Sequence, residues 1–481
     1  MEPSEFRRHG HALVDWIAEY LSGAERYPVL SRVSPGDVRN GLPTSAPEHG
    51  ESFDAIFADF ERVLVPALTH WNHPGFLAYF ASSASAPGVL AEFLAAARNQ
   101  QAMLWRTSPA STELEEVSLG WLRQLMGLPD AFEGVIYDTA SISSLHALAA
   151  AREAAVPAVR NDGLAGRADL PGLSVYCSEH AHSSIDKAVI LLGLGHRALR
   201  HVPADDQFRM RVDALQDAIA KDRAANLIPV AVVATAGTTS TTSVDPIREI
   251  ADVCRRESIW LHVDASYAGV TAILPEYRVH FDGWEHADSV VVNPHKWLFT
   301  PMDLSAFYCR RMDVVRQAFS LVPEYLRTAE GSRGVRNLMD TGIQLGRRFR
   351  SLKLWMVLRH FGAEGVREVL TEHIRLARLF AQWVDEDVEF ERLAPVPFRV
   401  VCFRARPRAM AAASAAELDT FNEELLAAVN ASGDVFLSHT QLNGVLTLRV
   451  AIGHLNTAER HVARAWQLLR EHTEQLLSLH R

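Results

Sequence analysis

Through the middle of the chain, short runs of apolar and β-branched residues alternate with stretches whose apolar residues repeat at helical spacing. The short runs predict strands over 135–137, 173–177, 198–202, 229–234, 260–264, 289–292 and 304–309. The helical spacing predicts helices between several of them, over 142–155, 183–192, 212–223 and 246–257. Alternation of this kind is typical of a large, mainly parallel sheet that helices cover on both faces.

The two ends of the chain show a different pattern. An amphipathic helix with apolar positions that include Phe6 and Ile17 opens the chain, and a second helix is predicted near 53–68. Neither helix has an obvious local core, so contact with another subunit would explain their apolar faces. The other end is predicted to be a small α+β region, with a helix near 346–385, a strand near 398–403, a helix near 415–430, a strand pair around Asn443-Gly444 and a terminal helix from Thr457.

These patterns divide the chain into three expected parts. They are an N-terminal helical arm over 1–80, a large α/β domain over 81–365 and a small α+β domain over 366–481. A length of 481 residues agrees with more than one folding unit.

Composition and charge disfavour several classes of protein. The chain has 48 basic and 58 acidic residues, and a net charge of −10 argues against a nucleic-acid binder, which needs a basic surface. Cys177, Cys254, Cys309 and Cys402 are scattered, which argues against a disulfide framework and against a zinc site. No apolar leader opens the sequence, and no apolar run is long enough to cross a bilayer. We therefore expect a cytoplasmic protein with no metal, no membrane and no nucleic-acid partner.

Charged and hydroxyl side chains follow four of the predicted strands. Asp264 ends one strand, and Lys296 follows the next strand within the sequence Asn-Pro-His-Lys-Trp. A third strand runs into the small, hydroxyl-rich turn 235–239, and a fourth runs into 138–141, which opens a helix. Because ligands gather at the carboxyl ends of parallel strands, we expect these groups to meet at one edge of the sheet.

A lysine, a carboxylate and a hydroxyl-rich helix start are the groups needed to hold pyridoxal phosphate. The lysine amine can bind the cofactor aldehyde as a Schiff base. The carboxylate can keep the pyridine nitrogen protonated, so that the ring accepts electrons. The amides of a helix N-terminus, together with Thr139 and Ser141, can bind the phosphate.

Longer motifs around these residues resemble the group II pyridoxal-phosphate decarboxylases, most closely the aromatic L-amino-acid decarboxylases that act on DOPA or tryptophan. The similarity runs nearly end to end, and the pair NPHKW and HVDASYAG at this spacing is very specific. The segments that carry it are THWNHPGFLAYF (69–80), SPASTELE (108–115), AHSSIDKA (181–188), WLHVDASYAG (260–269), NPHKW (293–297) and LGRRFRSLKLW (345–355).

The resemblance implies the fold type I, aspartate aminotransferase-like architecture, and pyridoxal 5'-phosphate as cofactor. It makes Lys296 the Schiff-base lysine, Asp264 the partner of the pyridine nitrogen, and His182 the imidazole that stacks on the ring. Tyr325 matches a loop tyrosine that protonates the substrate carbon, at the base of a lid over 327–339. The other implied cofactor contacts are Thr139, Ala140, Ser141, Thr239, Ser266, Asn293 and His295.

The family also implies a substrate pocket and a homodimer with its sites at the subunit interface. The implied pocket residues are Trp71, Tyr79, Phe80, Ser82, Gln101, Met103 and Gly346. Gly346 agrees with the aromatic branch, since histidine decarboxylases tend to carry serine there. Gln101 and Met103, however, replace residues that are more apolar or aromatic in animal relatives. The preferred substrate therefore stays open among DOPA, tyrosine, tryptophan, 5-hydroxytryptophan and phenylalanine.

The phosphate turn also departs from the family pattern. The family has Gly-Ser-Ala-Ser where this chain has Asp138-Thr139-Ala140-Ser141, and an acid there would repel a phosphate. We expect Asp138 to point away from the phosphate or to cap the following helix. Ser266 also stands where close relatives commonly have alanine.

Three functions fit these residues. The first is decarboxylation of an aromatic L-amino acid to the arylalkylamine and CO2. The second is oxidative decarboxylation and deamination to an aromatic aldehyde on the same fold. The third is a non-catalytic binding protein derived from such an enzyme. Relatives that form aldehydes typically lose the loop tyrosine or change the stacking histidine, so the presence of Tyr325 and His182 favours the first.

One glycine-rich segment imitates a dinucleotide-binding fingerprint. Residues 193–198, Gly-Leu-Gly-His-Arg-Ala, match G-x-G-x-x-A. The segment follows a predicted helix and precedes a predicted strand, which reverses the strand–turn–helix order that the fingerprint requires. A nicotinamide cofactor is therefore not expected.

Overall fold

The computed structural model describes residues 1–321 and 335–479, which form two compact units. The first unit contains 1–81, 373–393 and 401–481, and the second contains 82–372 and 394–400. Over the described residues, no helix combines the length and the apolar character needed to cross a membrane.

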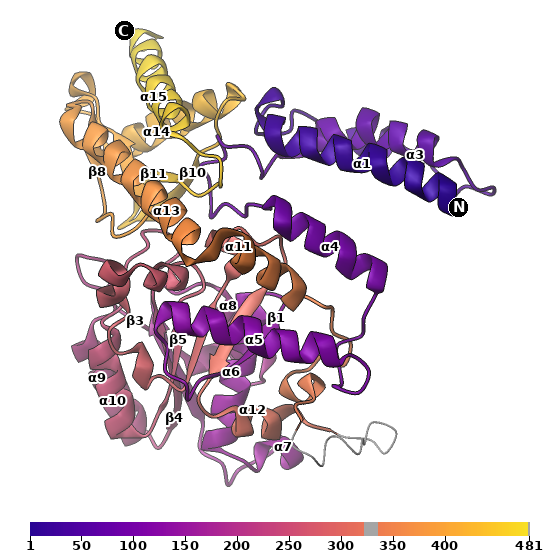
Figure 1. Cartoon of the computed structure of the whole chain (residues 1–481). Helices are drawn as coiled ribbons and strands as arrows, with labels where there is room; N and C mark the ends of the chain where they lie inside the picture. Colours follow the sequence, from indigo (N-terminus) through magenta and orange to yellow (C-terminus); the bar gives the residue numbers. More distant parts are fainter. Residues whose placement is uncertain (322–334, 480–481) are drawn as a thin grey trace. The chain divides into compact units, whose positions relative to one another are not determined.

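The second unit is built on a seven-stranded sheet (Figure 1). Strand β7 runs antiparallel to both of its neighbours, and the other pairs run parallel, which confirms the mainly parallel sheet. The strands, in order across the sheet, are β1 (Glu133–Tyr137), β7 (Ser305–Cys309), β6 (Ser289–Val292), β5 (Trp260–Asp264), β4 (Ile228–Thr235), β2 (Leu173–Ser178) and β3 (Leu199–Val202).

Helices pack on this sheet through small and branched apolar side chains. Helices α6 (Ala140–Ala155), α8 (Ser184–Leu191) and α12 (Met312–Phe319) share one core with residues such as Val175 and Phe307. The alanine-rich face of α6 lets this helix lie close to the strands it crosses. Helices α9 (Val212–Ala224) and α10 (Ile247–Glu257) pack against β4. Strands β5 and β6 are buried along their whole length, which explains their continuous apolar sequences.

The predicted strands and helices of this unit agree with the observed ones to within about two residues at each end. Helix α5 (Pro109–Met126), which packs against β1, was not predicted, and neither was α4 (Ala86–Arg98). The remaining helices are α7 (Val159–Asp162), α11 (Pro294–Trp297) and α13 (Ser351–Glu386), the last interrupted at Gly362 and continuing into the first unit.

The first unit contains a four-stranded sheet in the order β10-β11-β9-β8. The tight turn between β10 and β11 is confirmed at Asn443-Gly444, where both residues have positive φ, as a two-residue hairpin requires. The strands are β8 (Phe390–Arg392), β9 (Val400–Ala405), β10 (Ser438–Leu442) and β11 (Val445–Ala451), and the helices beside them are α14 (Ala415–Ala431) and α15 (Glu459–Leu479).

The N-terminal helices of the first unit contact each other through aromatic rings. Trp16 on α1 (Pro3–Gly23) packs edge-on against Phe57 on α3 (Phe53–Asp59), with ring centroids 6.1 Å apart. The helix predicted near 53–68 is confirmed as a helical stretch over 53–67, which is an α-helix as far as Asp59 and then continues as a π turn and a 3-10 turn. A short helix, α2 (Asp37–Asn40), lies between them in the sequence.

Candidate active site

The lysine and the aspartate lie on adjacent parallel strand ends. Asp264 is the last residue of β5, and Lys296 lies in the short helix α11 that follows β6. Ser266 links the two residues: its hydroxyl accepts a hydrogen bond from Lys296 Nζ at 3.1 Å, and its amide donates to Asp264 Oδ1 at 3.1 Å. Burial lowers the pKa of Lys296 below that of an exposed lysine, and the Asp264 carboxylate opposes that shift.

A further histidine, His262, lies two residues before Asp264 on the same face of β5. Its Nδ1 lies 2.9 Å from the hydroxyl of Ser289 on β6, and its Nε2 lies 3.1 Å from the hydroxyl of Ser144 on α6. Burial lowers the pKa of His262 to about 4, so the imidazole is neutral near pH 7. Sequence reasoning missed this residue, although strand alternation in His-Val-Asp places it on the same face as Asp264.

His182 lies between β2 and α8, as the sequence predicts. Its Nδ1 accepts a hydrogen bond from the backbone amide of Ser184 at 3.1 Å, so the proton of the neutral ring belongs on Nε2. Burial lowers the pKa of His182, while Asp264 and Lys296 are near enough to shift it in opposite directions. The site therefore offers a neutral imidazole that donates from Nε2.

The start of α6 forms the expected hydroxyl-rich turn. Thr139 is the N-cap residue, and its carbonyl accepts from the amides of Ile142 and Ser143 at 3.1 and 3.0 Å. Its side chain makes no capping hydrogen bond, which leaves the hydroxyl available beside the positive end of the helix dipole. Ser141 is exposed in the first helical turn, and Thr239 is exposed in the turn after β4.

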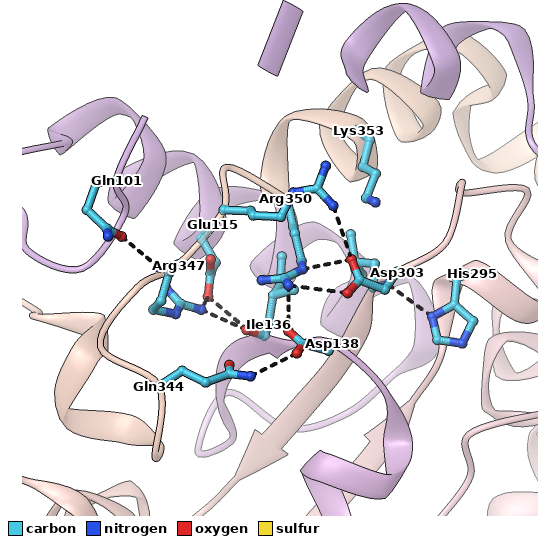
Figure 2. Close-up of polar contacts among 12 residues, drawn as sticks. Gln101, Glu115, Ile136, Asp138, His295, Asp303, Gln344, Arg347, Arg350 and Lys353 are labelled. Carbon is cyan, nitrogen blue, oxygen red and sulfur yellow. Dashed lines mark hydrogen bonds and ion pairs between the residues drawn. The ribbon is translucent and has the colours of Figure 1, made fainter. Parts of the chain in front are cut away.

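Asp138 does not cap α6, so that part of the expectation is wrong. Its Oδ1 lies 2.5 Å from Arg350 Nη2, and its Oδ2 accepts from Gln344 Nε2 at 2.8 Å (Figure 2). Arg350 also donates to both carboxylate oxygens of Asp303, at 3.0 and 3.2 Å. Burial alone would lower the pKa of Arg350, but Asp303 and Asp138 raise it overall. The acid in the phosphate turn is thus paired with a cation.

A buried ion pair fixes the same segment to β1. Arg347 Nη2 lies 2.8 Å from Glu115 Oε1 on α5, and both side chains are almost fully buried, at 5% and 3% exposure (Figure 2). Both residues also bond the backbone of Ile136, whose carbonyl accepts from Arg347 and whose amide donates to Glu115. The carboxyl end of β1 is therefore held by side chains from two distant segments.

Three of the implied substrate residues lie near Arg347 in the second unit, namely Gln101, Met103 and Gly346. Gln101 Oε1 accepts from the amide of Arg347 at 2.6 Å, and Met103 packs on Leu104 and Met339. A Cβ added to Gly346 would lie 3.3 Å from Gln101 Nε2, so a larger residue there presses on Gln101. Ser82 is half-buried at the start of this unit.

The other implied substrate residues belong to the first unit. Trp71 stacks on Phe76 with ring centroids 4.3 Å apart, and Tyr79 has a positive φ of 47°. The Arg449 guanidinium lies over the ring of Phe80 at 4.9 Å.

Tyr325 and residues 327–334 of the expected lid lie outside the described residues. At the end of that segment, Leu338 and Met339 are buried.

The groups present fit pyridoxal phosphate. The amine of the half-buried Lys296 lies beside a carboxylate, and a sixteen-residue helix presents its N-terminus and hydroxyls at the same sheet. Among the described residues, no protein group hydrogen-bonds the buried atoms Thr235 Oγ1 and Asn293 Oδ1 at the ends of β4 and β6. His295 is buried, its Nδ1 accepts from the amide of Leu304 at 3.0 Å, and burial lowers its pKa to about 4. These groups suit a polar cofactor with a phosphate and a ring.

Comparison with known proteins agrees with this geometry. Residues 35–406 match the model of the pyridoxal-dependent decarboxylase conserved domain. The chain is 41% identical to phenylacetaldehyde synthase of Arabidopsis thaliana over 99% of this chain and 97% of that protein. It is 38% identical to tyrosine decarboxylase of Papaver somniferum over 99% and 96% of the two chains.

A solved structure is also similar along the whole chain. The crystal structure of Oryza sativa TDC with PLP and tryptamine superposes with a TM-score of 0.95, at 37% identity, over 99% of each chain. Such similarity confirms the fold type I architecture, and the solved relative shows PLP in a chain of this fold. With the matched domain, the fold and the cofactor-binding groups in agreement, the chain belongs to the pyridoxal-dependent decarboxylase family.

Proposed function

We propose that this carboxy-lyase removes the carboxyl group of an aromatic L-amino acid and releases the arylalkylamine and CO2. The observation that carries the proposal is the amine of the half-buried Lys296, which is joined through Ser266 to the carboxylate of Asp264. The aromatic class is supported by relatives named for tyrosine and for phenylacetaldehyde at about 40% identity along nearly the whole chain.

Bound pyridoxal phosphate supplies the electron sink that makes loss of CO2 from an amino acid feasible. We assign Lys296 to hold its aldehyde and Asp264 to hold its ring nitrogen, with His262 orienting Asp264. His182 would stack on the ring and donate its Nε2 proton toward the substrate carboxylate. The start of α6 would bind the phosphate. The other cofactor contacts that we propose, to the phosphate or to the rest of the cofactor, are Thr139, Ala140, Ser141, Thr239, Ser266, Asn293 and His295.

Aldehyde formation on the same fold is the second candidate, because a relative at 41% identity is a phenylacetaldehyde synthase. In that reaction the amino acid, O2 and water are converted to the aldehyde, CO2, ammonia and hydrogen peroxide. The retention of His182 and Tyr325 supports the amine as the product of this chain.

Homodimer formation is a further part of the proposal. Leu90, Phe93 and Leu94 form one apolar stripe along α4, and their exposed fractions are 53%, 51% and 47%. A stripe of this kind at i, i+3 and i+4 is typical of a helix face that is covered by another surface. We infer that a second copy covers it, and that residues 1–80 serve as the dimerisation arm.

A cytoplasmic location is also proposed. Its support is that none of the buried residues Cys177, Cys254, Cys309 and Cys402 forms a disulfide, which suits a reducing compartment.

A panel of DOPA, tyrosine, tryptophan, 5-hydroxytryptophan and phenylalanine should give amine and CO2 in equal amounts. Lys296→Ala should abolish turnover of every member and leave the melting temperature nearly unchanged, because only an amine at this position can bind the cofactor aldehyde. The matched control is Lys221→Ala, which removes an exposed lysine on α9 and should keep normal turnover. Turnover of no aromatic substrate, or normal turnover by Lys296→Ala, would refute the assignment.

Tyr325→Phe should shift the product from amine toward aldehyde. If Tyr325 delivers the proton to the substrate carbon, slower protonation gives O2 more time to react at that carbon. Amine, aldehyde, ammonia and oxygen uptake are measured together for the variant and for the wild-type enzyme. Unchanged amine formation without oxygen uptake would mean that another group supplies the proton.

Arg350→Gln should weaken the binding of pyridoxal phosphate by about tenfold or more, since it leaves Asp138 and Asp303 without their shared cation. Asp138→Asn alone should change the affinity little, and the double variant should recover part of the loss. Fluorescence titration of the apoenzyme with the cofactor measures all three affinities. Arg256→Gln is the control, because Arg256 on α10 is exposed and pairs with Glu257. A large gain in affinity from Asp138→Asn would show that its charge still reaches the phosphate.

Sedimentation velocity of the holoenzyme should show a dimer at micromolar concentration. The double variant Leu90→Asp/Phe93→Asp should sediment as a monomer, because it places two charges in the apolar stripe. Val279→Asp changes another exposed apolar residue, at 72% exposure outside the stripe, and should leave the dimer intact. A fully active wild-type monomer would contradict the proposal.

A further inference from the structure

Two imidazoles and a carboxylate converge on the surface of the second unit. Asp186 on α8 places its Oδ1 3.0 Å from His196 Nε2 and 3.1 Å from His201 Nε2 on β3. One ligand atom from each of the three residues lies within 4.8 Å of the others. None of these residues belongs to the cofactor site described above.

The glycine-rich segment that imitates a dinucleotide fingerprint builds this cluster. Gly193 and Gly195 both have positive φ, 74° and 82°, which lets the chain turn sharply between α8 and β3. His196 opens the 3-10 turn directly after Gly195, and its ring lies 6.5 Å from that of His201 at an angle of 61°. The turn thus places His196 beside His201, which lies on the edge strand β3.

A buried thiol orients one of the two imidazoles. Cys177 on β2 is the register partner of His201, and its Sγ lies 3.8 Å from His201 Nδ1. With Nδ1 directed at this sulfur, Nε2 faces Asp186 and the solvent. Metal-binding histidines commonly use their second ring nitrogen in this way, so that a neighbouring group fixes the ring orientation.

We propose that Asp186, His196 and His201 form a site for a divalent transition metal ion of the zinc class. Ligand atoms about 2.1 Å from a tetrahedral metal are separated by ~3.4 Å, so the observed separations of 3.0 and 3.1 Å need only a small expansion. Imidazole and carboxylate together suit zinc, nickel, cobalt or copper rather than magnesium or calcium. With three protein ligands, the fourth position is left for water.

Occupation of this site would join α8 to the edge strand β3. Helix α8 begins at Ser184, whose amide and hydroxyl hold His182 Nδ1. A metal at Asp186, on the same helix, therefore stabilises the segment that positions His182. The inference does not depend on which substrate the enzyme takes.

The test uses untagged holoenzyme that has been dialysed against a chelator and then titrated with zinc sulfate by equilibrium dialysis. We expect one zinc ion per chain at this site, and a loss of ~10-fold or more in affinity for His196→Ala, His201→Ala and Asp186→Asn. Zinc should also raise the melting temperature of the wild type and not that of these variants.

His49→Ala is the matched control, because it removes an exposed histidine that is not one of the three cluster residues and should leave zinc binding unchanged. His196 is 64% exposed, so its removal leaves the core intact and keeps the test valid if His201→Ala fails to fold. Zinc binding that is equal in the wild type and His196→Ala, or the absence of stoichiometric binding in the wild type, would overturn the proposal.

Discussion

The constraint on which the rest of the site depends is a half-buried lysine amine beside a buried carboxylate at the carboxyl ends of two parallel strands. Removing either charge from water is costly, and only their proximity and their hydrogen bonds offset the cost. Ser266 bonds to both groups, and His262 fixes the strand beneath Asp264 through hydroxyls on α6 and β6. The same burial lowers the pKa of Lys296, which favours the neutral, nucleophilic amine.

The turn over 138–141, which the family resemblance assigns to the phosphate, also contains a charged side chain that needs a partner of opposite charge. An acid at the start of this turn would oppose a phosphate, but Arg350 pairs with it and with Asp303 (Figure 2). Arg347 and Glu115 then fix the segment that carries Arg350 to the carboxyl end of β1. An acid can therefore stand at position 138, where the family has glycine, because Arg350 from a distant segment supplies the compensating charge.

Local pattern and long-range pairing explain which parts of the molecule could be predicted from the sequence. Strands β5 and β6 were predicted with their observed bounds, because buried parallel strands leave continuous apolar runs. The placement of Asp264 and Lys296 followed directly from those bounds. The pairing of Asp138 with Arg350 leaves no periodic signal, and the N-cap residue of α6 is Thr139, whose side chain makes no capping hydrogen bond. The role of each implied site residue toward the cofactor still rests on the family resemblance.

The residues that we propose for the chemistry and those that we propose for substrate choice lie in different parts of this chain. Lys296, Asp264 and His182 follow strands of one sheet, whose packing fixes their positions. Gln101 and Gly346 lie on connecting segments outside the sheet, and they contact each other closely enough that a side chain at Gly346 would displace Gln101. Such segments tolerate change without disturbing the sheet core. One decarboxylase scaffold can therefore support relatives named for different aromatic substrates and for an aldehyde product, and substitutions in these segments offer the most direct route between them.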